Sequence, residues 1–358
     1  MFKITVLVDS DPRKIISPKE EEKRVQSKEE TVHCKPAEIG PTLPYQNNNK
    51  ITISKIMKNL ILAFTLFIIS ISSSVFAQTK RTPASFGREE YIEVEKNVRL
   101  HVTDLGEGQP IVLIHGWPLS DAMYEYQYAY LIQKGYRVIG ITLRGFGLSD
   151  KPAGKYNYDV FADDIKVILD KLKIENATIG GFSMGGATVI HYVAKYNAAH
   201  VSKMALFGAA APTWTKRDDF NYGFWTKEDA NGLIDLNNTN RPELFATFGK
   251  IFPANESSVS PGHGAWLGNI QAQASPYAMA EALKTLRDSD LRGDLKKITI
   301  PTLILHGKQD KICSYALAEQ MNVLLKNSTL VPFEKSGHAL FIEELEKFNT
   351  ELFNFIKK

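Results

Sequence analysis

A serine stands between glycines where a short apolar run gives way to a helix-like segment. Ser183 lies in Gly181-Phe182-Ser183-Met184-Gly185, after the apolar run 177–180 and before the helix-like stretch 186–196. A turn this sharp between a strand and a helix excludes bulky neighbours, which accounts for the glycines. It also strains the serine backbone and lifts the hydroxyl above the sheet edge. An incidental serine in a glycine-rich turn would not need the flanking strand and helix, so the pattern predicts a nucleophile.

A nucleophilic serine needs a general base, and the base needs an acid that orients it. After a serine in this type of turn, the acid comes next along the chain and the histidine last. The strand-like run 302–305 leads into a loop that carries Asp310, and the run 329–331 leads into His338. Both residues therefore follow parallel strands at the sheet edge where ligands bind. The order predicts a triad of Ser183, Asp310 and His338.

The other histidines of the chain lack this placement. His115 and His306 each precede a glycine at the end of a strand-like run, and we interpret both as loop-shaping residues. His101 lies within an early strand and His191 on the helix after the serine, so packing roles are expected for them.

The oxyanion of an acyl-transfer intermediate needs backbone donors beside the nucleophile. In this arrangement one donor is the N–H just after the serine, and the other comes from the loop after the third strand. The run 111–114 leads into His115-Gly116-Trp117-Pro118. Because Pro118 has no N–H, the expected donors are the N–H groups of Met184 and Trp117. Trp117 and Pro118 are also expected to contact the acyl group.

Short apolar strands alternate with helical segments, which predicts a mostly parallel sheet with helices on both faces. We expect eight strands, the first two as a hairpin, at 91–94, 100–104, 111–114, 138–141, 177–180, 204–207, 302–305 and 329–331. The expected helices are 120–134, 158–172, 186–196, 314–325 and 340–356.

The alternation of strands and helices stops between residues 210 and 292, where the sequence is helical and rich in aromatic residues. We expect this stretch to form a helical cap, inserted after the sixth strand and laid over the site. Most of its aromatic side chains should pack within the cap. A few, with Trp214 as the candidate, should line an apolar acyl or aryl pocket.

The first 77 residues differ from the rest of the chain. Residues 1–56 form a polar extension without periodicity, which is either disordered or a misassigned start. Residues 57–77 have the layout of a signal peptide, namely a lysine, an apolar run over 60–71 and a small-x-small site before Gln78. We therefore expect a mature chain of 78–358, exported to the periplasm or secreted. The alternatives are an uncleaved anchor behind a disordered tail, or a cytosolic protein with an apolar helix.

Charge and cysteine usage exclude several classes of function. The chain has 43 Lys and Arg residues, of which eleven lie in residues 1–77, and 40 Asp and Glu residues, of which eight lie there. Residues 78–358 therefore carry 32 positive and 32 negative side chains. This balance gives no sign of a nucleic-acid partner or of stable membrane association after signal cleavage. No Cys and His cluster has metal-ligand spacing, and no nucleotide-type glycine loop is present. We expect neither a metal nor a cofactor, and we interpret Cys313 as a packing thiol.

Several motifs together resemble those of the α/β-hydrolase superfamily, and more narrowly those of arylesterases and cofactor-free haloperoxidases, also called perhydrolases. The resemblance covers 91–358 and rests on His115-Gly116-Trp117-Pro118-Leu119-Ser120, Arg144-Gly145-Phe146-Gly147-Leu148-Ser149-Asp150, Phe161-Ala162-Asp163-Asp164, Gly181-Phe182-Ser183-Met184-Gly185-Gly186, and His306-Gly307 with Asp310. It implies an α/β-hydrolase fold and a hydrolase without a cofactor. The region after Gly208 departs from the family's usual pattern, so the resemblance does not indicate the substrate.

A serine nucleophile implies an acyl-enzyme, formed from an ester, lactone, thioester, amide or activated C–C bond. We expect an esterase acting on a small-molecule carboxylic ester. The resemblance adds a perhydrolase or haloperoxidase side activity, in which hydrogen peroxide replaces water and the product is a peracid. One alternative is a C–C bond hydrolase or lactonase with the same triad. A second, of another class, is a ligand receptor of this fold, which would hydrolyse its ligand only about once per site.

Overall fold

The computed structural model describes residues 88–358. The expectations for residues 1–56 and 57–77 lie outside the described residues. The described chain forms one eight-stranded sheet in the order β1-β2-β4-β3-β5-β6-β7-β8. Its strands are β1 (Arg88–Glu95), β2 (Val98–Leu105), β3 (Pro110–Ile114), β4 (Arg137–Ile141), β5 (Ala177–Phe182), β6 (Val201–Phe207), β7 (Thr302–Gly307) and β8 (Ser328–Phe333).

The sheet is mostly parallel, as the alternation of strands and helices predicts. Only β2 runs antiparallel to its two neighbours, β1 and β4, while the strands from β4 to β8 are parallel to one another. Every residue of β5 and β7 is buried. This is the pattern of strands that are covered on both faces, which explains why they read as continuous apolar runs in the sequence. The prediction of an eight-stranded α/β sheet is confirmed.

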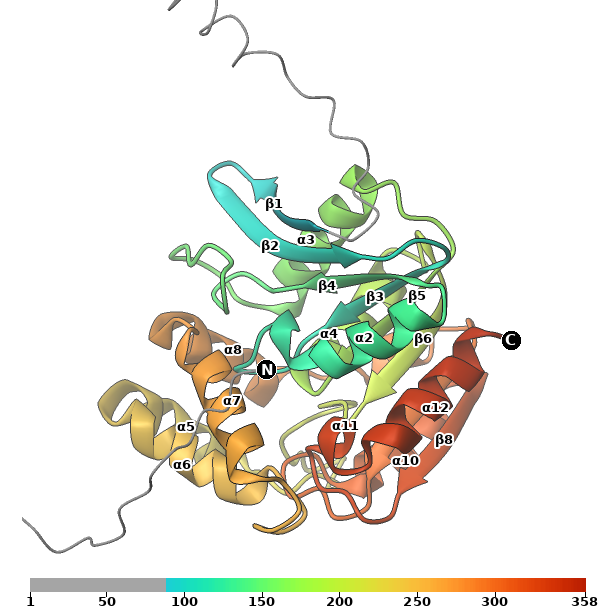
Figure 1. Cartoon of the computed structure of the whole chain (residues 1–358). Helices are drawn as coiled ribbons and strands as arrows, with labels where there is room; N and C mark the ends of the chain where they lie inside the picture. The colour runs from blue at the N-terminus through green and yellow to red at the C-terminus, as the bar shows by residue number, and fades with distance from the viewer. Residues whose placement is uncertain (1–87) are drawn as a thin grey trace, which may run out of the picture. The chain divides into compact units, whose positions relative to one another are not determined.

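Helices cover both faces of the sheet (Figure 1). Ile111 and Leu113 of β3 pack with α2 (Glu125–Gln133) and α12 (Leu345–Ile356) on one face. Val112 and Ile114, which point the other way, pack with α3 (Tyr158–Lys171), α4 (Met184–Lys195) and α10 (Tyr315–Leu324). Among residues 88–358, no helix has the length and apolar composition that a membrane crossing requires.

Two of the expected helices are interrupted. The segment expected at 120–134 begins as a 3₁₀ turn, η1 (Asp121–Tyr124), before α2. The segment expected at 340–356 breaks between α11 (Leu340–Glu343) and α12, because Glu344 has φ −124° and ψ 52°. The carboxylates of Glu343 and Glu344 accept hydrogen bonds from the loop 335–337. These contacts draw the chain out of the helical path at this point.

A group of helices separates β6 from β7. These are α5 (Lys227–Thr239), α6 (Arg241–Ile251), α7 (Pro261–Ala272) and α8 (Pro276–Asp288), followed by the short α9 (Arg292–Leu295). We call α5 to α8, with their connections, the cap. Figure 1 shows these four helices, in yellow and orange, gathered to one side of the sheet. The side chains of Thr226, Asn240, Ser260 and Ser275 each cap one of them, so the local sequence sets where these helices begin.

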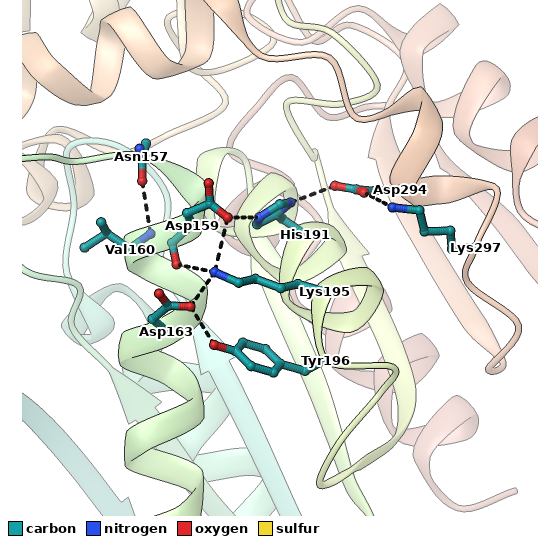
Figure 2. A network of polar contacts seen from close by, with 9 residues as sticks. All are labelled: Asn157, Asp159, Val160, Asp163, His191, Lys195, Tyr196, Asp294 and Lys297. Atoms are coloured by element: carbon teal, nitrogen blue, oxygen red, sulfur yellow. Dashed lines mark hydrogen bonds and ion pairs between the residues drawn. The ribbon is translucent and has the colours of Figure 1, made fainter.

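His191 connects α4, the helix that follows the serine, to two other helices by polar contacts (Figure 2). Its Nδ1 lies 2.7 Å from Asp294 of α9, and its Nε2 lies 3.0 Å from Asp159 of α3. Lys195 of the same helix reaches Asp159 and Asp163, while Lys297 reaches Asp294. The hydrogen bond to Asp294 raises the pKa of His191 against the effect of desolvation, and Asp159 adds to the increase.

His191 therefore makes stability depend on pH. Because the folded-state pKa is raised, the extra stability is complete below the unfolded value, about 6.5, and is lost as the pH rises through the folded-state pKa. We expect His191→Gln to lower the free energy of unfolding by about 1 kcal/mol near pH 5.5 and by much less near pH 9. Urea unfolding of both proteins at the two pH values measures this, and a difference independent of pH would contradict it.

Candidate active site

Ser183 occupies a sharp turn between β5 and α4. Its φ of 52° and ψ of −118° confirm the predicted strain, which costs about 1–3 kcal/mol in residues other than glycine. The turn is held from both sides, since Ser183 N donates to Phe207 O and Ala210 N donates to Ser183 O. A Cβ on Gly185 would lie 2.3 Å from the carbonyl oxygen of His115. Only glycine fits there, because the third-strand loop packs directly on the turn.

The acid and the histidine meet as the sequence predicts. Asp310 Oδ2 lies 2.6 Å from His338 Nδ1. Asp310 Oδ1 accepts hydrogen bonds from the N–H groups of Ile312 and Cys313, both at 2.8 Å. With the carboxylate held in this way, His338 Nδ1 donates to it and Nε2 is left as the basic nitrogen. Asp310, His338 and Ser183 are all buried.

Two neutral histidines shape the surrounding loops, which is the role that their sequence positions predict. His115 Nδ1 donates to Gly116 O, and His115 Nε2 accepts from Leu143 N. Desolvation lowers the pKa of His115 to about 4. His306 Nε2 donates to Cys313 O at 2.8 Å and lies 3.5 Å from Asp310 Oδ2, while desolvation lowers its pKa. These two residues fix the loops on either side of the triad.

Cys313 is the only free cysteine of the described residues, and it is fully buried. Desolvation raises the pKa of its thiol well above the usual value, with the charge of Asp310 as a further cause. A thiol that resists ionisation is a poor nucleophile. Within residues 88–358, no group of three or more His, Cys, Asp or Glu side chains is arranged to hold a metal ion.

The two expected oxyanion donors flank the serine. Met184 is the first residue of α4, and Trp117 follows β3 in the loop that packs on the turn. In the part of the chain that the structure describes, neither backbone N–H donates to a protein acceptor. The N-terminus of α4 adds a partial positive charge at the same place. The indole of Trp117 donates to Met279 O of α8, and the Trp117–Pro118 peptide bond is cis.

A cavity of about 280 Å³ opens onto the serine and the histidine. Five residues that the sequence assigned to the site contribute to its wall, namely Ser183, His338, Trp117, Pro118 and Trp214. Most of the other lining residues are apolar and come from the cap and from the loop after β7, including Phe248, Phe252, Val259, Leu267, Leu283, Leu286 and Ile312. Sequence reasoning missed these, because a helix pattern shows which face is apolar but not what that face covers.

Aromatic side chains join the cavity wall to its surroundings. Trp225 stacks on Trp214, with ring centroids 5.3 Å apart, and also on Phe248. The indoles of Trp214 and Trp225 both donate to Ile312 O, three residues before the helix that follows Asp310. Phe248 in turn meets Trp117 edge to face at 5.2 Å. The cap is therefore packed against both the acid loop and the oxyanion loop.

Comparison with known proteins places this chain in a family. The model of the α/β hydrolase fold matches residues 109–345. The chain is 45% identical over 265 residues to the AB hydrolase superfamily protein YisY of Bacillus subtilis, covering 74% of this chain and 98% of that protein. Among solved structures, it is similar to the esterase EaEST from Exiguobacterium antarcticum (40% identity, TM-score 0.74) and to a bromoperoxidase from Bacillus anthracis (32%, 0.74). Each covers 76% of this chain and 100% of the solved chain.

Proposed function

The chain belongs to the α/β-hydrolase fold family, in the group of esterases and haloperoxidases, and is a hydrolase; within this group, we propose that it is a serine esterase. Its proposed substrates are small-molecule carboxylic esters. The observation that carries the proposal is that the serine and the histidine line the same cavity. Ser183, on its strained turn, and His338, paired with Asp310, open into the same mostly apolar space. The solved esterase that the chain resembles supports the same reaction class.

The proposed reaction proceeds through an acyl-enzyme. His338 Nε2 takes the proton of Ser183 as its oxygen attacks the ester carbonyl carbon, and Asp310 stabilises the imidazolium. The negative oxygen of the tetrahedral intermediate is held by the N–H groups of Trp117 and Met184. The C–O bond to the alcohol then breaks, and His338 returns the proton to the leaving oxygen. Water, activated by the same nitrogen, attacks the acyl carbonyl and regenerates the serine.

The apolar wall favours neutral acyl groups. The lining residues with charged side chains, Lys250 and Glu256, are exposed, so a charge deep in the cavity would lose its hydration without gaining a partner. A panel of p-nitrophenyl esters from acetate to octanoate, run beside lactones and C–C bond hydrolase substrates, tests the proposal. Turnover of many esters per site supports an esterase, while a single acylation event per site would indicate a receptor instead.

A perhydrolase side activity is favoured by the similarity to a bromoperoxidase. In that reaction hydrogen peroxide attacks the carbonyl carbon of the acyl-enzyme, the C–O bond to Ser183 breaks, and the acyl group leaves as a peracid. Pro118 lies next to the donor Trp117 and lines the cavity. Its ring restricts the loop that contacts the acyl group, and the Trp117 carbonyl can accept the second O–H of peroxide.

We expect Pro118→Leu to lower the preference of the acyl-enzyme for peroxide over water by about tenfold, while ester hydrolysis is retained. The partition ratio, measured with one acyl donor at several peroxide concentrations, gives the answer. Pro118→Ala serves as a control for loss of the ring without added bulk. An unchanged ratio in Pro118→Leu would leave Pro118 with a purely structural role.

We also propose that the enzyme is exported and that its mature form begins at Gln78. The support is the signal-peptide layout of residues 57–77. Mass spectrometry of the protein from its native host would refute this by detecting peptides of residues 1–56 in the active form.

A further inference from the structure

The loop that carries His338 is attached to the cap by its backbone. We call residues 335–339 the histidine loop and residues 252–258, which follow α6, the cap segment. The N–H groups of His338 and Ala339 donate to the carbonyl oxygen of Phe252, at 2.8 and 3.1 Å. The ring of Phe252 also meets the imidazole of His338 edge to face, with centroids 5.5 Å apart. The position of His338 therefore depends on a residue of the cap segment.

The two backbones are also in direct contact. A Cβ on Gly337 would lie 2.4 Å from Ala254 N and 2.5 Å from the carbonyl carbon of Pro253. No side chain fits between the histidine loop and the cap segment, so a displacement of one pushes on the other.

A single carboxylate joins the two segments. Glu343 Oε2 accepts the N–H of Gly337 at 2.7 Å, on the histidine loop. Glu343 Oε1 accepts the N–H of Ala254 at 2.7 Å and the hydroxyl of Ser258, both on the cap segment. Hydrogen bonds to an ionised acceptor are stronger than neutral ones. Lys311 Nζ donates to Ala254 O at 2.9 Å, so the loop of Asp310 is joined to the same place.

The cap segment also lines the substrate cavity. Phe252, Pro253 and Glu256 line it together with Ser183 and His338. An acyl group long enough to reach the cap would therefore touch Phe252 and Pro253, which also contact the histidine loop.

We propose that Glu343 is a positioning residue that couples the cap segment to His338, so that an acyl group filling the cavity orders the general base and raises kcat. The proposal rests on the esterase function proposed above. Specificity for longer acyl groups then resides in kcat as well as in KM. Because a misplacement of about 1 Å can cost about 100-fold in rate, a small movement of the histidine loop is sufficient.

The neighbouring Glu344 provides a matched control. Its Oε2 accepts the Lys335 N–H and the Ser336 hydroxyl, both on the histidine loop, whereas the donors of the cap segment bond to Glu343. A glutamine carbonyl can replace that one oxygen. At Glu343 both oxygens accept N–H groups, so a glutamine must turn its NH₂ toward one of these donors. Glu343→Gln therefore breaks the link, while Glu344→Gln keeps its hydrogen bonds to the histidine loop and loses only an ion pair of 3.9 Å with Lys347.

The test is kcat and KM across esters from acetate to octanoate for wild type, Glu343→Gln, Glu344→Gln and Ser258→Ala. We expect kcat of the wild type and Glu344→Gln to rise with acyl length. Glu343→Gln should lose about 10- to 100-fold in kcat on the longest ester, with little change in KM and almost no dependence on length. Ser258→Ala, which removes one cap contact without touching the histidine loop, should show a smaller loss of the same kind.

Thermal unfolding of each variant separates coupling from stability. Glu343→Gln and Glu344→Gln with the same dependence on acyl length would overturn the coupling, and so would a change confined to KM. If the wild type turned over no ester, the esterase proposal would fail. The coupling would still be measured by the rate at which alkyl phosphonates of graded length label Ser183. Equal labelling of wild type and Glu343→Gln at every length would then overturn it.

Discussion

Replacing Ser183 with alanine is expected to lower kcat for ester hydrolysis by about 10⁴- to 10⁶-fold. The hydroxyl is the attacking group, and without it only the backbone donors and the cavity remain to assist water. Alanine has to adopt the same backbone conformation as serine, with φ near 52°, so the variant bears the same strain and should retain the fold. The measurement is steady-state hydrolysis by the purified variant, with its thermal midpoint compared with that of the wild type.

Contamination by other esterases limits such a measurement, so labelling by a phosphonate provides a second readout. The wild type should acquire one phosphonyl group at Ser183, and Ser183→Ala should acquire none. Retention of more than about a tenth of the wild-type activity would exclude Ser183 as the nucleophile.

Asp310→Asn is expected to cost about 10⁴-fold in kcat. The two N–H groups of Ile312 and Cys313 point at Oδ1, so an asparagine has to place its carbonyl oxygen there. Its NH₂ then faces His338 Nδ1, which must become an acceptor. The proton moves to Nε2, and the imidazole can no longer take the proton of Ser183. The fold should be preserved, because the side chain keeps its shape and its hydrogen bonds with the N–H groups of Ile312 and Cys313.

Asp310→Ala serves as the comparison, because it leaves the tautomer of His338 unconstrained. Its loss in kcat, divided by the number of hydrogen bonds removed, should be smaller than that of Asp310→Asn, because Asp310→Asn enforces the wrong tautomer. Near-normal activity in Asp310→Asn would mean that another group orients the histidine. His306, 3.5 Å from the same carboxylate oxygen, would then be the next residue to vary.

Much of the fold and the site could be predicted because both depend on local patterns. The apolar runs of β5 and β7 predict buried parallel strands, and the residues at their carboxyl ends must meet at one sheet edge. Ser183 comes directly after β5, Asp310 lies in the loop after β7, and His338 lies in the loop after β8, the parallel strand at the edge of the sheet. The strained turn could be predicted from Gly181 and Gly185 together with the flanking strand and helix, because a sharp turn between these elements excludes bulky neighbours.

The missed features depend on contacts between residues far apart in the sequence. His191 was expected to pack, yet its partners Asp159 and Asp294 come from helices that the topology brings together. Glu343 lies in a segment that has the amphipathic pattern of one continuous helix, and only the fold shows that the helix breaks beside it. The cavity wall depends on how the cap helices lie on the sheet, which no helical periodicity specifies.

The arrangement of tryptophans around the cavity gives this protein an optical property of its own. The chain has four tryptophans. Trp117 and Trp214 line the cavity, and Trp225 stacks against Trp214. Three of the four indoles therefore lie in or beside the cavity, where the polarity around them changes when an acyl group displaces water. Intrinsic fluorescence can follow acylation and deacylation in real time, without a chromogenic leaving group, for esters that have no colour change.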